Sequence, residues 1–149
     1  MSDNQLWFMN AYLNVVLSQA DSAANISVIE HKMREGFGPP LHVHTEEDET
    51  FYALEGSFRF RVGDETVELE TGQSLHVPGG TIHTFRVLSA VGRLLTVTNG
   101  AFEDMVRAAS VPAQVADLPA QAPMSVDDQT RLAKLCNQNG IQFLGPPIE

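Results

Sequence analysis

The first hundred residues of the chain show almost no helical periodicity and consist instead of short apolar or alternating runs. Turn-forming residues separate these runs at intervals of about 8–12 residues, as in antiparallel β proteins. Phe58, Phe60 and Val62 alternate with Arg59 and Arg61, which gives such a run one apolar and one polar face. The predicted strands are 12–17, 26–33, 50–54, 58–62, 66–69, 74–77, 83–88 and 94–98. About eight short strands in one domain favour a sandwich, a jelly roll or a small barrel, so we expect an all-β fold.

The pattern changes after residue 100, where helical spacing and proline-rich sequence replace the alternation. Apolar residues at helical spacing predict a short helix over residues 102–109. A connector with three prolines follows, and Ser125 then begins a capping box that predicts a helix ending before Gly140. We expect a barrel domain with its short helix over 1–110, an extended connector over 111–124, and a C-terminal helix and tail packed on the barrel over 125–149.

Composition excludes several classes of partner. The 149 residues suffice for one domain with a sizeable core and hardly for two. The formal net charge of −10 repels phosphate and anionic lipid, so we expect neither a nucleic acid nor a membrane as partner. Cys136 is the single cysteine, which excludes a disulfide within the chain. With no apolar run near the ~20 residues that cross a bilayer, and no secretory signal, we expect a cytoplasmic protein.

Three of the five histidines and one glutamate have a spacing that suits a metal ion. His42 and His44 follow two prolines that favour extended backbone, and residues two apart on such a segment project to one face. Glu49 precedes one predicted strand and His83 opens another. Three imidazoles and one carboxylate suit divalent Fe, Mn, Ni, Co, Cu or Zn and leave positions open for water, substrate or dioxygen. We therefore expect one divalent metal ion as cofactor.

The same residues resemble two sequence motifs of the cupins. Gly36-x5-His42-x-His44-x4-Glu49-x6-Gly56 is similar to the first cupin motif at every position. Gly72-x5-Pro78-x-Gly80-x2-His83 is similar to the second. The resemblance implies a double-stranded β-helix, or jelly-roll, barrel with a short C-terminal helical extension, in which the four residues named above hold the metal. Val87 departs from the second motif, which usually carries an asparagine that is not a ligand.

The order of barrel, helix, proline-rich connector and closing segment resembles small single-domain cupins described as quercetin-dioxygenase-like. This resemblance implies a metal-dependent dioxygenase that cleaves a small aromatic or enol-type substrate, with Glu49 as both ligand and catalytic base. Two alternatives stay open. One is a metal-dependent isomerase or lyase that works without dioxygen, and the other is a non-enzymatic cupin that binds a small ligand.

Apolar side chains near the expected ligands are candidates for contact with a small-molecule substrate. Alternation places Phe51 on the face of Glu49, and Phe85 and Val87 on the face of His83, while two further residues approach the first motif. The candidate substrate contacts are Phe51, Phe85, Val87, Phe37 and Met33.

The remaining acidic and histidine residues near the motifs are given other roles. Asp48 is the second-best candidate for the carboxylate ligand, whereas the acidic run that it forms with Glu46 and Glu47 is typical of a solvated loop. His31 and His76 are expected not to bind the metal, and His76 is expected to point away from the barrel interior.

The N-terminal segment 6–17 suggests self-association. Trp7, Phe8, Tyr12 and Leu13 give it more apolar surface than an edge strand tolerates in water. We expect a homodimer that forms through this segment.

Overall fold

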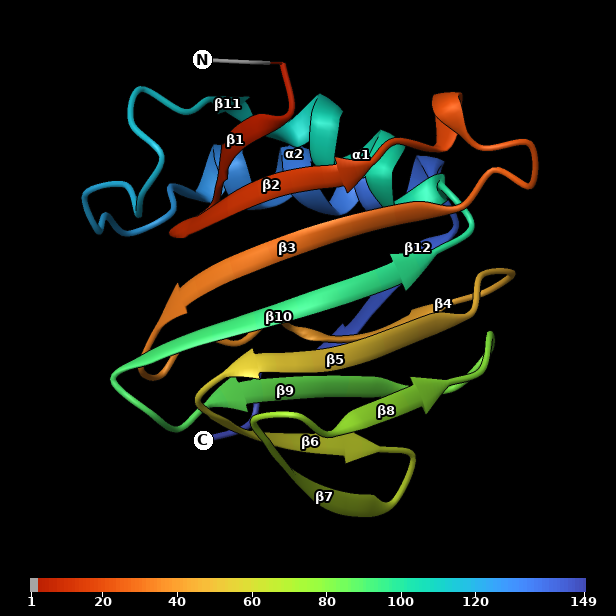
Figure 1. Ribbon diagram of the computed structural model, residues 1–149, viewed down its shortest axis with the longest axis vertical. Helices are drawn as coiled ribbons and strands as arrows, with labels where there is room; N and C mark the ends of the chain where they lie inside the picture. Colours follow the sequence, from red (N-terminus) through yellow and green to blue (C-terminus); the bar gives the residue numbers. More distant parts are fainter. Residues whose placement is uncertain (1–2) are drawn as a thin grey trace.

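Two antiparallel β-sheets lie face to face in the computed structural model, which describes residues 3–149 (Figure 1). One sheet has the order β11 (Val111–Pro112), β1 (Gln5–Phe8), β2 (Ala11–Leu17), β3 (Ser27–Arg34), β10 (Val91–Thr98), β5 (Glu49–Glu55) and β8 (Ser74–Val77). The other has the order β12 (Ile141–Gly145), β4 (Leu41–His44), β9 (His83–Val87), β6 (Ser57–Val62) and β7 (Glu65–Glu70). A 3-10 turn, η1 (Gln19–Asp21), follows β2, and the helices are α1 (Ala101–Ala109) and α2 (Val126–Gln138).

The core lies between the sheets because alternate residues of each strand point inward. Phe51 from β5 and Phe60 from β6 meet with ring centroids 4.8 Å apart, and Phe60 lies 5.2 Å from Phe85 of β9. Phe58 is completely buried beside them. Aromatic pairs at these separations stabilise a core beyond the burial of their area alone.

Gly56 carries the chain from one sheet to the other in a single residue between β5 and β6. Its φ of +90° lies in the left-handed region that favours glycine. A Cβ atom there would lie 2.3 Å from Ser89 Oγ and 2.6 Å from Val91 O, so no side chain fits. Steric crowding and the positive φ therefore explain why position 56 of the motif is a glycine.

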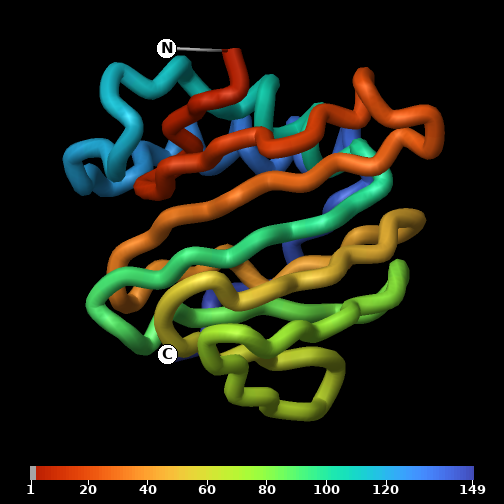
Figure 2. Tube along the Cα trace, viewed as in Figure 1, coloured from red at the N-terminus to blue at the C-terminus, as the bar shows by residue number. Residues whose placement is uncertain are grey.

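Both helices pack at one end of the barrel, behind β1 and β2 in the view of Figures 1 and 2. Ser125 caps α2 as expected, since its hydroxyl accepts a hydrogen bond of 3.0 Å from Asp128 N. Leu132 and Cys136 are the buried residues of α2. The expected helical extension is confirmed.

The structure confirms an all-β jelly-roll barrel, but it contains more strands than predicted. β1, β4, β11 and β12 were not among the predicted strands. β12 matters most, because the segment expected to be a plain tail pairs with β4, with Ile141 opposite His44 and Phe143 opposite His42. The C-terminal residues therefore support the strand that carries two of the expected ligands.

Most apolar side chains of the N-terminal segment are buried within the fold of the chain itself. Leu6, Phe8, Tyr12 and Leu13 are buried, and only Val16 of β2 is largely exposed. The surface on which the homodimer was expected is therefore mostly absent, and the oligomeric state stays a prediction. Among the described residues, no helix is long and apolar enough to cross a membrane.

Candidate metal centre

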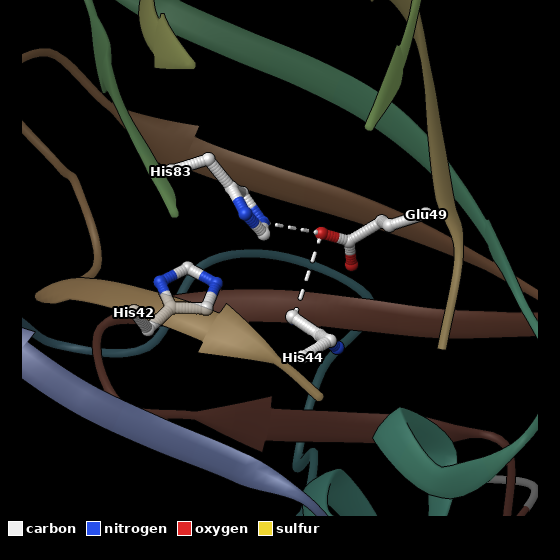
Figure 3. A group of neighbouring side chains, drawn as sticks. All are labelled: His42, His44, Glu49 and His83. Carbon is white, nitrogen blue, oxygen red and sulfur yellow. Dashed lines mark hydrogen bonds and ion pairs between the residues drawn. The ribbon is translucent and has the colours of Figure 1, made fainter. Parts of the chain in front are cut away.

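The four expected ligands come from both sheets and converge on one point (Figure 3). His42 and His44 lie on β4, and His83 is the first residue of β9, where it pairs directly with His42. Glu49 is the first residue of β5 in the opposite sheet. On β4 the two histidines point the same way because they are two residues apart on a strand.

The cluster is buried and compact. The exposed fractions are 8% for His42, 2% for His44, 3% for Glu49 and 1% for His83. One ligand atom from each residue lies within 4.8 Å of all the others. Ligands on opposite sides of a metal with bonds of about 2.1 Å lie about 4.2 Å apart, so a small contraction would bring the four groups to bonding distance.

Each imidazole is oriented by a hydrogen bond at Nδ1. His42 Nδ1 donates to Pro40 O at 2.7 Å, and His83 Nδ1 donates to Thr81 O at 2.9 Å. A carbonyl oxygen only accepts, so Nδ1 carries the hydrogen in both rings and Nε2 of a neutral ring carries the lone pair. His44 Nδ1 makes the corresponding bond to Glu47 Oε1 at 3.1 Å. Such bonds fix the tautomer in which Nε2 binds a metal.

The Nε2 atoms of His44 and His83 face the carboxylate of Glu49, and a cation between these groups would fit this arrangement. His83 Nε2 lies 3.1 Å from Glu49 Oε1, and His44 Nε2 lies 3.7 Å from the same oxygen. Within residues 3–149, His44 Nε2 is buried and has no hydrogen-bond partner. A lone pair directed at a carboxylate oxygen is unfavourable unless a proton or a metal ion lies between them. The donor set therefore fits a divalent metal ion.

The pKa values of the cluster reflect burial and mutual charge. Burial lowers the pKa of His42, and the neighbouring His83 lowers it further. Burial also opposes the charged form of His44, but Glu49 and Glu47 outweigh it, so the pKa of His44 is raised. For Glu49, burial acts to raise the pKa, whereas the three histidines together hold it well below its ordinary value. The cluster thus favours an anionic carboxylate, as a ligand must be.

Two small clefts adjoin the cluster. One, of about 60 Å³, is lined by His42 and Glu49, and the other, of about 50 Å³, by His42 and His44. Apart from His42, the residues that line both clefts are apolar: Phe8, Met9, Pro39 and Phe102. The clefts offer space for a small ligand beside His42, His44 and Glu49.

Three of the five candidate substrate contacts lie at this site. Phe37, Phe51 and Phe85 line the larger cleft. Met33 and Val87 are fully buried in the core and are not among the described residues that line either cleft. Met33 pairs with Gly92, and a Cβ on Gly92 would contact Val87 at 2.9 Å, so both residues lie by Gly92. Val87 is four residues, or about 13 Å, along β9 from His83.

Two other residues near the cluster are placed as expected. Asp48 is exposed, and its Oδ1 accepts a hydrogen bond from Gly79 N at 2.8 Å, so Glu49 is the carboxylate of the cluster. His76 is half exposed and lies outside the cluster.

His31 contributes to the site in a way that sequence reasoning missed. It is buried, lines the larger cleft with Glu49 and stacks on Phe102 with ring centroids 5.8 Å apart. Its Nε2 lies 2.8 Å from Thr96 Oγ1, and burial lowers its pKa to about 4. The signal was present, because alternation along β3 places His31 on the inward face with Ile29.

The expectation that Glu47 lies in a solvated loop is wrong. Glu47 is instead 5% exposed and binds His44. Its two neighbours Glu46 and Asp48 are exposed, as expected. No local pattern distinguishes Glu47 from them, since its other partners belong to a segment far away in the sequence.

A two-sheet jelly-roll barrel with three histidines and one glutamate gathered between the sheets defines a class of protein. The family model of the Cupin domain matches residues 30–98, which include all four residues of the cluster. The match and the barrel support a protein of the cupin superfamily.

Individual relatives differ in the activities that their names describe. Over 99 residues the chain is 29% identical to quercetin 2,3-dioxygenase of Bacillus subtilis, a match that covers 66% of this chain and 29% of that protein. The structure of ectoine synthase from P. lautus is similar with a TM-score of 0.61 and 18% identity, covering 99% of this chain and 86% of that one. A predicted oxalate decarboxylase from Thermotoga maritima is similar with a TM-score of 0.56 and 21% identity, covering 59% and 78%. The chain spans less than a third of the dioxygenase, and the two structural likenesses concern the fold alone.

Proposed function

We propose that the chain binds one divalent metal ion through His42, His44, Glu49 and His83 and acts as a dioxygenase on a small aromatic or enol-type substrate. The observation that carries the metal site is the set of Nε2 atoms directed at one buried carboxylate beside an apolar cleft. The dioxygenase activity is supported by the 29% identity to quercetin 2,3-dioxygenase.

The residues of the chain would each have a defined part. A divalent ion bound there would act as a Lewis acid toward a substrate oxygen and bring the substrate together with dioxygen. The backbone carbonyls of Pro40 and Thr81 hold two of the imidazoles in place, so the site needs little reorganisation on binding. Glu49 supplies the negative charge. A carboxylate of low pKa is a weak base, so proton removal by Glu49 stays a prediction.

The cleft favours a small substrate with an apolar body. Phe51, Phe85 and Phe102 provide walls that bind a ring or an alkene and exclude water. The volume of about 60 Å³ is far below the roughly 300 Å³ at which pockets for drug-sized ligands begin. A compact enol or a single ring is therefore a better candidate than a flavonol, unless the walls move.

Metal content tests the first half of the proposal. We expect about one equivalent of divalent metal per chain in protein purified without chelator, and none in the double variant His42→Ala/His44→Ala. His76→Ala removes an exposed histidine outside the cluster and is the matched control, with metal content expected at the wild-type level. A double variant that is folded and keeps stoichiometric metal would contradict the site.

Dioxygen uptake tests the second half. Metal-loaded protein is mixed with compact enediols and with flavonols while dissolved dioxygen is recorded, and uptake that depends on His83 is the expected result. Substrate turnover of equal rate under anaerobic conditions would instead establish the isomerase or lyase alternative. Stabilisation by a ligand without any turnover would establish the binding module.

A further inference from the structure

We propose that Glu47 is a positioning residue that orients His44 and joins it to the first turn of α1. Its effect on metal binding rests on the proposed function, whereas its effect on the ring of His44 and on α1 does not. Glu47 is the buried member of an otherwise exposed acidic loop between β4 and β5.

Three donors from two distant parts of the chain meet at this carboxylate. Oε1 accepts from His44 Nδ1 at 3.1 Å and from Phe102 N at 3.1 Å. Oε2 accepts from Asn99 N at 3.0 Å. A carboxylate only accepts hydrogen bonds, so it matches all three donors at once. A glutamine would turn an NH₂ group toward at least one of them.

The contact with His44 completes the pattern of the other two histidines. Acceptors hold Nδ1 of His42 and His83, and Glu47 does the same for His44. The hydrogen is thereby kept on Nδ1, and the lone pair of Nε2 is directed into the cluster. Here the acceptor is a side chain and not a backbone carbonyl, so a substitution can remove it.

The contact with α1 replaces a cap that the helix lacks. Within the described residues, the N-cap position Gly100 supplies no side-chain hydrogen bond to α1. The N–H groups at the start of a helix have no partner inside it, and the positive end of its dipole attracts an anion. Glu47 satisfies Phe102 N and stands at this end of the helix. A loop residue thus does what a capping residue normally does.

The two contacts together connect a metal ligand with the wall of the substrate cleft. The ring of Phe102 lines both clefts and lies 5.9 Å from the ring of His44 and 5.8 Å from that of His31. Because the same carboxylate holds His44 and the backbone of Phe102, the position of the ligand and that of the wall are set together. Loss of Glu47 should loosen both.

The first test observes the ring nitrogens of His44 in metal-free protein by long-range ¹H–¹⁵N correlation. In the wild type we expect Nδ1 to carry a hydrogen directed at Glu47, whether or not Nε2 carries a second one. A wild-type ring with its proton on Nε2 alone would overturn the proposal without any variant. In Glu47→Gln and Glu47→Ala we expect a mixture of tautomers, together with faster hydrogen exchange at the amides of Asn99 and Phe102. Glu46→Gln, a change at the exposed neighbour, should leave both readouts as in the wild type.

The second test measures binding of Zn²⁺ by competition with a chromophoric chelator. Loss of an outer residue that orients a metal-bound histidine weakens metal affinity about 10- to 100-fold, and we expect this loss in Glu47→Gln but not in Glu46→Gln. Unchanged tautomer, exchange and affinity in folded Glu47→Gln would overturn the inference. If wild-type protein binds no Zn²⁺, the proposed function fails, whereas the tautomer and exchange measurements still decide the role of Glu47.

Discussion

Glu103 is a second buried carboxylate, and it holds the loop after β2 against α1. It is 1% exposed and accepts hydrogen bonds from Ser18 Oγ at 2.7 Å, Gln19 N at 2.9 Å and Arg107 Nε at 2.9 Å. Glu103→Gln should lower the free energy of unfolding at pH 7 by about 2–3 kcal/mol, because an amide cannot accept all three bonds and leaves a buried donor unpaired. Urea denaturation of the wild type and the variant measures the difference.

The effect of Glu103 should depend on pH. Burial acts to raise its pKa, but the hydrogen bond from Gln19 N and those from Arg107 and Ser18 outweigh burial, so the pKa of Glu103 is lowered. A lowered pKa contributes stability that is complete above the unfolded value, about 4.3, and disappears as the pH falls through the folded value. The difference in the free energy of unfolding between the wild type and Glu103→Gln should therefore decrease from pH 7 toward pH 3. A difference in the free energy of unfolding that stays constant over this pH range would show that the charge of Glu103 does not stabilise the contact.

Individual site residues could be predicted from the sequence where the reason for their position is local. His42 and His44 share a face because they are two residues apart on an extended segment. Glu47 could not be found in this way, because its burial depends on Asn99 and Phe102, more than fifty residues later in the chain. Val87 shares a face with His83 but lies away from both clefts, because a shared face does not imply a shared end of the strand.

At the scale of elements, β12 should decide how firmly β4 is held. Ile141 is 2% exposed and pairs with His44, so Ile141→Ala should destabilise the fold by about 2–5 kcal/mol and also weaken metal binding. Leu144 in the same strand is 47% exposed, and Leu144→Ala is the matched control, with an expected change below about 0.5 kcal/mol. Thermal unfolding and the Zn²⁺ competition measure both effects. If Ile141→Ala is destabilised but keeps its metal affinity, the prediction that β12 affects metal binding through β4 is wrong.

Helix α2 contains a natural reporter of its docking. Cys136 is 1% exposed, and burial raises the pKa of its thiol to about 12. Since the thiolate is the reactive form, iodoacetamide should not label folded protein at pH 8 and should label it fully in denaturant. Mass spectrometry gives a simple answer because the chain has one cysteine. Rapid labelling of folded protein would mean that α2 separates readily from the barrel.

Elements could be predicted where their own pattern is strong. Alternation identified β6 and the capping box identified α2. The strands β1, β4 and β11 were not predicted, and none of them is longer than four residues, which leaves little room for a periodic signal. β12 is visible as a strand only through its pairing with β4. Local sequence does not encode such a distant partner.

For the whole molecule, metal binding should appear as thermal stability. An ion that binds the folded state alone adds about 2.7 kcal/mol when its free concentration is 100 times Kd. For a chain of this size, Tm should then rise by roughly 5–10 °C. Calorimetry with and without chelator measures the shift, and the His42→Ala/His44→Ala variant should show none. An equal shift in that variant would place the bound ion elsewhere on the protein.

The pairing of β12 with β4 also sets an order of events during synthesis. The two strands are separated by about 100 residues, which take the ribosome roughly 5–20 s to add at 5–20 residues per second. During this interval the strand that completes the sheet of His42 and His44 has not yet been made. Under the proposed function, a nascent chain therefore presents this histidine pair before β12 can pair with β4, and only the folded barrel brings it together with Glu49 and His83.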